Sequence, residues 1–334
     1  MTKDISYAMY TNHIHIQLLQ EDLTRTGLYQ WMNVFKGKIH RFQDAKPEDI
    51  CKHDIIQVNA SRQDLNLIPR LRKIIDDNNA KTKLVVNNDY TTELWFGSFD
   101  YPEEVGEAMR HAHMLFGTEY YMCTAVEEIT GRKCYEIPHP CHVKRLKILP
   151  KEPKQEVIGI LWHRYDNPVY IPWFMARNHG LKTRLLGYTR DVDKKPYVAE
   201  SMYNEILPGK NFPEFCRDML RCRVLVEPFT LHSHGRCTLD TAALGIPVVG
   251  SDRVESVRRC YPHTTIDPYD IKKGRELINK LLTDDEFYDK VSSTAQKEVE
   301  YYNQENAKKR YLKALKEETD VDFLDEPKEE VVQK

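Results

Sequence analysis

The sequence predicts an α/β protein made of two Rossmann-like domains. Short apolar runs rich in valine and isoleucine alternate with segments whose apolar residues recur at helical spacing, and the alternation occurs twice along the chain. This pattern, with short connections, indicates mainly parallel sheets that bind ligands beyond the carboxyl ends of their strands. A length of 334 residues suits two domains. Two such domains are expected to enclose a deep cleft, where a large substrate would bind.

The first domain is expected over residues 1–147. Its predicted strands are 5–9, 14–16, 54–58, 83–86, 120–124 and 133–137. Its predicted helices are 27–35, 65–75, 103–116 and 125–130. Residues 144–154 are charged, contain prolines and show no periodicity, so we expect an interdomain linker there.

The second domain is expected over residues 155–300. Its predicted strands are 157–161, 183–186, 224–226 and 246–250. Its predicted helices are 168–178, 212–220, 238–244 and 272–282, and the chain is helical and polar from 285 to about 314. Residues 317–334 are strongly acidic and poor in apolar side chains, which predicts a disordered tail.

Charge and cysteine content limit the possible functions. The formal net charge is −2, but the tail alone carries eight acidic residues and two lysines, so the remainder is mildly basic. Such a balance suits phosphorylated ligands and does not require nucleic acid. No long apolar run or signal peptide occurs and the eight cysteines are scattered, so we expect a cytoplasmic protein without a membrane segment.

One group of potential metal ligands requires a separate examination. Cys134, His139, Cys141 and His142 lie close together in the sequence, but their spacing fits no common zinc template. Two prolines also stiffen this segment against wrapping an ion. No metal site is therefore expected.

The most informative segment is 221–251, RCRVLVEPFTLHSHGRCTLDTAALGIPVVGS. It predicts a strand, a glycine loop, a helix, a tight turn and a second strand. The backbone N–H groups of Gly235, Arg236, Cys237 and Thr238 would open the helix and point at a ligand above the sheet. A helix N-terminus attracts anions, and phosphate is a common one.

This segment resembles the sugar-nucleotide site of retaining glycosyltransferases with the GT-B fold, the "glycosyl transferases group 1" family. That family has Glu-Gly-Phe-Gly-x-x-x-x-Glu-Ala followed by Gly-x-Pro-Val-Val, and residues 245–249 match the latter. Gly235 falls on the second glycine and Asp240 on the second glutamate, so the resemblance implies that Asp240 binds the ribose. The first glutamate, which contacts the hexose, is replaced by His232, which brings no fixed negative charge. His234 is counted with the donor-binding residues, and both histidines are alternative proton carriers.

Further correspondences extend the resemblance along the chain. Gly27 stands where the family has a glycine loop near the donor, and residues 136–140 resemble the end of the first domain. Residues 159–164 resemble the strand ending in Gly-Arg, which implies that Arg164, beside His163, neutralises the diphosphate, although the family's following lysine is absent. The side chain of Arg236 is a further candidate for the diphosphate.

The acceptor side is expected in the first domain. Residues 85–90, VVNNDY, resemble the family's Val-x-x-His-Asp, whose histidine lies near the reacting sugar. Asn88 takes the place of that histidine, and Asp89 is kept. Asn88, Asp89 and His232 are therefore the candidate catalytic residues.

The resemblance implies a GT-B glycosyltransferase whose C-terminal helix, within 300–316, crosses back to the first domain. The donor would be a nucleoside-diphosphate sugar, UDP- or GDP-linked, used with retention and without a metal or other cofactor. The acceptor is left open among a glycan, a lipid-linked sugar, a small molecule and modified DNA. Two alternatives remain: a degenerate domain that binds a nucleotide sugar or a partner without turnover, and a sugar-nucleotide epimerase of the same fold.

Overall fold

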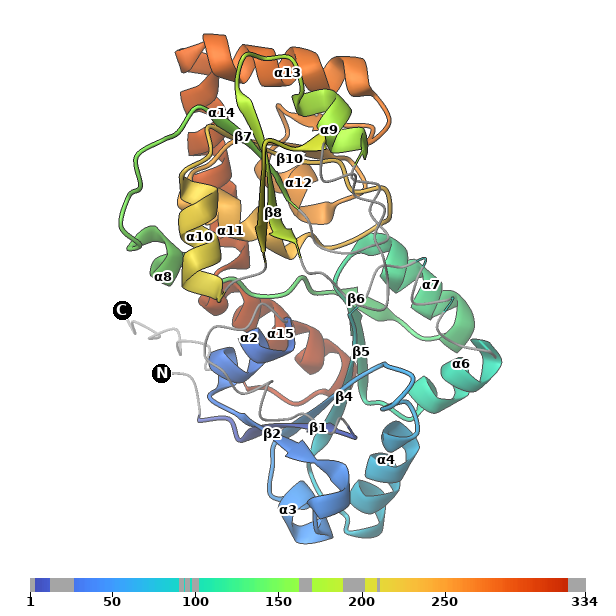
Figure 1. Cartoon of the computed structure of the whole chain (residues 1–334). Coiled ribbons are helices and arrows are strands. Elements are labelled where there is room, and N and C mark those ends of the chain that lie inside the picture. Colours follow the sequence, from blue (N-terminus) through green and yellow to red (C-terminus); the bar gives the residue numbers. More distant parts are fainter. Residues whose placement is uncertain are drawn as a thin grey trace, which may run out of the picture.

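The computed structural model describes residues 4–12, 27–89, 93, 97, 102–161, 170–188, 202–208 and 211–323. In these residues the chain forms two six-stranded sheets flanked by helices, and all strand pairings in both sheets are parallel (Figure 1). The predicted fold class, α/β with two parallel sheets, is confirmed. No helix in these ranges is long and apolar enough to cross a bilayer.

The first sheet has the strand order β2-β1-β3-β4-β5-β6. Its strands are β1 (Tyr7–Thr11), β2 (Lys38–Arg41), β3 (Ile55–Asn59), β4 (Lys83–Asn88), β5 (Met114–Gly117) and β6 (Cys134–Glu136). The helices of this half are α2 (Gly27–Phe35), η1 (Phe42–Asp44), α3 (Pro47–Cys51), α4 (Leu67–Asp77), α6 (Pro102–Arg110), α7 (Tyr120–Thr130) and α8 (Val143–Lys147).

The second sheet has the order β12-β11-β10-β7-β8-β9. Its strands are β7 (Val157–Leu161), β8 (Lys182–Tyr188), β9 (Glu205–Pro208), β10 (Val224–Glu227), β11 (Val248–Ser251) and β12 (Thr265–Ile266). Its helices are α9 (Tyr170–Ala176), α10 (Phe212–Leu220), α11 (Arg236–Leu244), α12 (Glu255–Cys260), α13 (Ile271–Thr283) and α14 (Asp285–Glu298). The chain then continues through η3 (Val299–Tyr302) into α15 (Gln304–Thr319).

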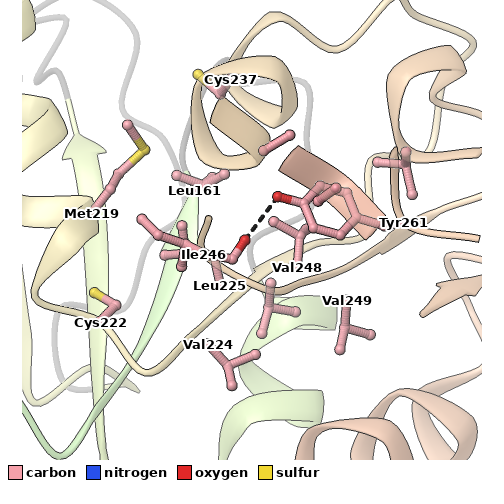
Figure 2. Close-up of a cluster of buried hydrophobic side chains, with 14 of the residues drawn as sticks. Leu161, Met219, Cys222, Val224, Leu225, Cys237, Ile246, Val248, Val249 and Tyr261 are labelled. Atoms are coloured by element: carbon pink, nitrogen blue, oxygen red, sulfur yellow. Dashed lines mark hydrogen bonds between the residues drawn. The ribbon is translucent and has the colours of Figure 1, made fainter. Parts of the chain in front are cut away.

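Each half has its own apolar core. In the second half, the central strands bury valines and leucines against helices on the sheet faces, as Figure 2 shows around Leu225 and Val248. Tyr261 is also fully buried there, and its hydroxyl donates to the carbonyl oxygen of Ile246 at 2.7 Å. The buried phenol therefore has the hydrogen bond that burial of a polar group requires.

The C-terminal helix belongs to the core of the first half. The chain leaves the second sheet through η3, and α15 packs beside α2 against the first sheet (Figure 1). Tyr311 on α15 contacts Trp31 and Phe116, with ring centroids 5.0 and 5.5 Å away. The predicted crossing of the last helix is thus confirmed. The chain of the second half ends in a helix that packs in the core of the first half.

Two helix and strand predictions in the first half are wrong. Residues 103–116 do not form one helix, because α6 ends at Arg110 and residues 114–117 form β5, buried between β4 and β6. Residues 120–124 are helical instead of extended. Their aromatic and β-branched side chains suggest a strand, but the Glu119 side chain caps a helix in which Met122, Val126 and Thr130 are buried at helical spacing.

Other boundaries differ from the prediction. The strands β2, β9 and β12 were not predicted, and α8 lies within the expected linker 144–154. The acidic tail begins later than expected, because α15 extends to Thr319 and Phe323 is buried with the first-half core. Glu318 also pairs with Arg132 at 2.9 Å. The predicted strand 14–16 lies outside the described residues.

The strand order fixes where loops can form a site. In the second sheet β7 pairs with β10, and the order reverses between them. Loops leaving neighbouring strands at such a switch point diverge and open a crevice at the carboxyl end of the sheet. The loop after β10 leads into α11, which contains the motif singled out from the sequence.

Candidate functional site

The loop between β10 and α11 is held by the segment that follows β11. The backbone N–H of Ser233 donates to the carbonyl of Arg253 at 3.2 Å, and the N–H of Glu255 donates to Ser233 at 2.9 Å. The N–H of Ser256 donates to the carbonyl of His234 at 3.2 Å. The loop is therefore paired along its backbone, which fixes where its side chains lie.

Gly235 ends this loop and caps α11. Its φ is +77°, in the left-handed region that favours glycine. A Cβ atom on Gly235 would lie 2.1 Å from Cγ1 of Val254 and 2.5 Å from Oγ of Ser256. The glycine is thus required both by its conformation and by the close approach of the next segment.

The N-terminus of α11 presents backbone donors. The amide of Gly235 donates to the hydroxyl of Ser233 at 3.2 Å within the loop. The first amides of a helix, which in α11 begin at Arg236, have no acceptor within the helix itself. Together with the positive end of the helix dipole, they can bind an anion.

Several side chains of α11 already contact other protein groups, which the sequence does not predict. The Arg236 guanidinium donates to the carbonyl of Pro140 in the first half and lies 3.6 Å from the carboxylate of Asp240. Asp240 is fully buried. The hydroxyl of Thr238 donates to Glu227 at the end of β10. Ribose binding by Asp240 stays a prediction, and it requires the carboxylate to become accessible.

His232 contacts the first half directly. Its backbone N–H donates to both carboxylate oxygens of Glu93 at 3.1 Å, and its Nδ1 lies 2.7 Å from Oε1 of Glu93. The ring of Tyr121, on α7, lies 4.0 Å from the imidazole. No motif marks Glu93; only its position four residues after Asp89 could have drawn attention to it.

Asn88 and Asp89 lie at the carboxyl end of β4. Asn88 is fully buried, and its Nδ2 donates to the carbonyl of Phe116 at 3.0 Å, while Oδ1 has no partner among the described residues. Oδ1 of Asp89 lies 3.0 Å from Nε2 of His139. Nδ1 of His139 accepts from the indole N–H of Trp31 at 3.0 Å. The motif around His139 predicted only a domain end, so this contact with Asp89 was missed.

Two predicted residues, His234 and Asp89, are linked through His139, which was not predicted as a site residue. The rings of His139 and His234, from different halves, are 5.6 Å apart. Burial lowers the pKa of His234, although a hydrogen bond to Glu255 opposes that shift. Gly27 is the first residue of α2, and His163 and Arg164 lie outside the described residues.

The four potential zinc ligands have other surroundings. His139 lies against Trp31 and Asp89, as above, and Nε2 of His142 lies 3.0 Å from the amide nitrogen of Asn33. Cys141 is buried, which raises its pKa to about 12. Within the described ranges, no three His, Cys, Asp or Glu side chains are placed to hold a metal ion.

A charged pocket of about 510 Å³ includes Glu255, whose carboxylate lies 3.2 Å from the ring of His234. It is lined by residues from β6 of the first half and from α12, the segment after α12 and α14 of the second: Glu136, Glu255, Arg258, Arg259, Pro262, Thr294 and Glu298. Burial, with Glu255 and Glu119 nearby, raises the pKa of Glu136. The pocket thus contains carboxylates and guanidinium groups together and has no single sign of charge.

Comparisons with known proteins give no sequence relative. No protein-family model matches the chain. No curated protein matches it either.

Solved structures do match over nearly the whole chain. A trehalose-6-phosphate synthase has a TM-score of 0.70 and 9% identity, with 93% of this chain and 99% of that chain covered. An alpha-glucosyltransferase in complex with UDP and a 13-mer DNA containing an HMU base has a TM-score of 0.66 and 13% identity, with the same coverage. A sucrose-phosphate synthase from Thermosynechococcus elongatus has a TM-score of 0.63 and 13% identity, with 80% and 74% covered.

The chain has the GT-B fold. At 9–13% identity the likeness extends to the fold alone. One fold supports many functions, so any activity of this GT-B chain has to be argued from its site.

Proposed function

We propose that the chain is a glycosyltransferase that moves a sugar from a nucleoside-diphosphate sugar to a hydroxyl-bearing acceptor. The observation that carries the proposal is the meeting of the α11 loop of the second half with polar strand ends of the first. His232 lies against Glu93, and His234 lies beside His139, which contacts Asp89. An anion-binding helix end next to side chains that bind hydroxyls suits a sugar linked to a diphosphate.

The donor would lie on the second half. In this proposal the amides at the N-terminus of α11, together with Arg164, bind the diphosphate, and His163 and Gly27 lie near it. Asp240 binds the ribose once it is accessible. His232 and His234 contact the sugar, and Glu93 supplies next to His232 the carboxylate that the motif lacks. The base is uracil or guanine, as in the UDP- and GDP-sugars that the motif favours.

The chemistry we propose is retaining and needs no metal. The bond between the anomeric carbon and the phosphate oxygen breaks, and the acceptor oxygen forms the new bond on the same face. The acceptor proton passes to the departing phosphate oxygen, so no side-chain base is needed at position 88. Backbone amides and Arg164 stabilise the charge that builds on the diphosphate. Asn88 and Asp89 orient the acceptor hydroxyl through hydrogen bonds.

The acceptor carries a hydroxyl group and is one of four classes: a glycan, a lipid-linked sugar, a small molecule or modified DNA. Structural neighbours of the chain include an alpha-glucosyltransferase bound to DNA and synthases of sugar phosphates. These neighbours support the view that proteins of this fold can use different acceptors, but they do not favour one of the four classes for this chain.

A second candidate is a nucleotide-sugar-binding domain without turnover. Two substitutions favour it: His232 replaces a glutamate of the family pattern, and Asn88, whose amide nitrogen is bonded to Phe116, replaces a histidine. A sugar-nucleotide epimerase would show a third behaviour, interconversion of the sugar without transfer.

The test is a panel of UDP-, GDP-, ADP- and TDP-sugars with EDTA present, followed by nucleotide release and calorimetry. We expect slow hydrolysis of one donor. In His232→Gln, both hydrolysis and affinity for that sugar should fall about 10-fold, because about one hydrogen bond to the sugar is lost. His263→Gln, at an exposed position of the second half, is the matched control and should match the wild type.

Three other results would change the assignment. Tight binding of a donor without release, in the presence of candidate acceptors, favours the binding domain. A changed sugar on an intact nucleotide identifies an epimerase. Neither binding nor turnover of any member of the panel contradicts the proposal.

A further inference from the structure

His234 is a buried histidine whose two ring nitrogens have different surroundings. Its side chain is 5% exposed. Nδ1 lies 3.2 Å from Oε2 of Glu255, whereas Nε2 has no hydrogen-bond partner among the described residues. A buried polar atom without a partner is uncommon and calls for a ligand or an ordered water.

Glu255 and Tyr302 determine which nitrogen carries the hydrogen. The hydroxyl of Tyr302 donates to Oε1 of Glu255 at 2.7 Å, and Arg259 lies 3.7 Å from the same oxygen. A carboxylate can only accept hydrogen bonds, so Nδ1 of His234 must donate to Oε2. Since burial lowers the pKa of His234, the ring is neutral and Nε2 keeps its lone pair.

The facing histidine does not supply the missing donor in this structure. The indole of Trp31 donates to Nδ1 of His139, so in the neutral ring the hydrogen is on Nε2, which lies 3.0 Å from Asp89. The fold therefore fixes opposite tautomers in two imidazoles whose centroids are 5.6 Å apart. Nε2 of His139 lies 3.0 Å from Asp89 but forms no hydrogen bond among the described residues, with His234 included, so Nε2 of His234 still lacks a donor.

The position of His234 indicates what that donor is. Residue 234 immediately precedes Gly235, the N-cap of α11, whose first-turn amides can hold a phosphate. A group attached to that phosphate would be able to reach the imidazole once Nε2, which is buried here, becomes accessible. Sugar hydroxyls are hydrogen-bond donors of the kind that a neutral imidazole nitrogen accepts.

We propose that Nε2 of His234 accepts a hydrogen bond from a hydroxyl of the sugar attached to the diphosphate. Glu255 and Tyr302 are the positioning residues, because they hold the ring in the Nδ1–H tautomer. The sugar contact rests on the proposed function, whereas the tautomer does not.

Protonation of His234 would remove the acceptor and with it the sugar contact. The groups that face the ring are Glu255 on α12, Tyr302 in η3, His139 after β6 and Arg236 on α11. The Glu255 carboxylate favours the protonated ring, and Arg236 and burial oppose it. Affinity for the sugar should therefore decrease as the solution becomes acidic.

The tautomer can be read from the ¹⁵N shifts of the ring in protein labelled at histidine, with His234→Gln used to assign the signals. We expect His234 to be the Nδ1–H tautomer at pH 7.5. In Glu255→Gln the side-chain amide can donate to Nδ1, so the tautomer should change to Nε2–H. Tyr302→Phe should weaken the preference of His234 for the Nδ1–H tautomer. Glu298→Gln should leave that preference unchanged, because Glu298 lines the same pocket as Glu255 but His234 does not line it.

The sugar contact is tested by calorimetry with UDP-glucose and UDP. The wild type should bind UDP-glucose more tightly than UDP. In Glu255→Gln the affinity for UDP-glucose should fall about 10-fold, while the affinity for UDP stays the same. A change in the ¹⁵N chemical shift of His234 Nε2 on adding UDP-glucose, but not on adding UDP, would support the sugar contact.

Two kinds of failure are distinguishable. A wild-type His234 that is charged or carries its hydrogen on Nε2 overturns the tautomer and the contact together. If neither UDP-glucose and UDP nor GDP-glucose and GDP bind while the spectra show the expected tautomer, the proposed donor is wrong and the sugar contact is rejected with it. A Glu255→Gln variant that keeps its preference for UDP-glucose also overturns the contact.

Discussion

At position 232, a histidine stands where the resembling family has a glutamate, and the change implies the loss of a fixed negative charge. The structure places the carboxylate of Glu93, from the other half of the chain, 2.7 Å from the His232 ring. The charge is thus present beside the loop although it comes from a distant residue. A motif comparison considers one segment at a time and cannot detect such a replacement.

Gly235 illustrates a residue whose identity follows from backbone geometry. Gly235→Ala should destabilise the protein by about 2–5 kcal/mol, because a left-handed φ costs about 1–2 kcal/mol and overpacking adds about 1–3. The added Cβ would lie 2.1 Å from Val254. Urea unfolding followed by circular dichroism measures the change.

The matched control is Gly131→Ala. Gly131 also has a positive φ, +65°, but among the described residues no atom beyond its chain neighbours lies within 4 Å of its added Cβ. This variant should lose about 1–2 kcal/mol, the backbone contribution alone. Equal losses in the two variants would show that the close approach to Val254 and Ser256 does not matter.

The helix α7 shows how a single cap decides between two secondary structures. Glu119→Ala should cost about 1–2 kcal/mol, because the buried carboxylate accepts from the N–H groups of Tyr121 and Met122 at 2.9 and 2.8 Å. Urea denaturation gives the value. Glu128→Ala, at an exposed position of the same helix, should change stability by less than about 0.5 kcal/mol. If Glu119→Ala also changed the stability by less than about 0.5 kcal/mol, the cap could not be the reason for the helix.

For the whole molecule, the histidines predict how stability depends on pH. Burial lowers the pKa of five described histidines: His40, His53, His113, His179 and His234. The pKa of His113 falls to about 4, and its Nδ1 accepts from the N–H of Leu84 at 2.9 Å. An unfolded histidine titrates near 6.5, so the unfolded chain binds more protons than the folded chain between about pH 6.5 and 4. The free energy of unfolding should therefore fall as the pH falls through this window.

The contribution of one group can be isolated with His113→Asn, which keeps an acceptor for Leu84 and does not titrate. In the middle of the window the wild type should lose about 1.4 kcal/mol per pH unit more than the variant. The measurement is urea unfolding at a series of pH values. His263→Asn, at an exposed position, should follow the wild-type slope. A slope for His113→Asn equal to that of the wild type would contradict the buried neutral histidine.

Local sequence was enough for the elements in which pattern and environment agree. The strand at 157–161 and the helix at 212–220 are where the sequence predicts them. Residues 120–124 have the side chains of a strand, but the Glu119 cap and the spacing of the buried residues impose a helix. Short edge strands such as β12, with two residues, carry too little pattern to be predicted.

The candidate site divides in the same way. The glycine loop and the N-terminus of α11 could be predicted because turns and helix ends are encoded by adjacent residues. Glu93, Trp31, His139 and Tyr302 could not be predicted. They reach the site only because two sheets and a returning helix bring distant segments into contact, as α15 does in Figure 1.

The sequence by itself therefore determined the fold class, through its periodicity, and the glycine loop that begins α11, through a motif of neighbouring residues, while the returning last helix followed from the family resemblance. Tertiary structure alone decided that Asp240 is buried beside Arg236, that Glu93 supplies a carboxylate to His232, and that His139 and His234 face each other. The reason is that burial and hydrogen-bond partners are set by residues far apart in the chain. The same two facing histidines are in opposite tautomers because one accepts from an indole and the other donates to a carboxylate.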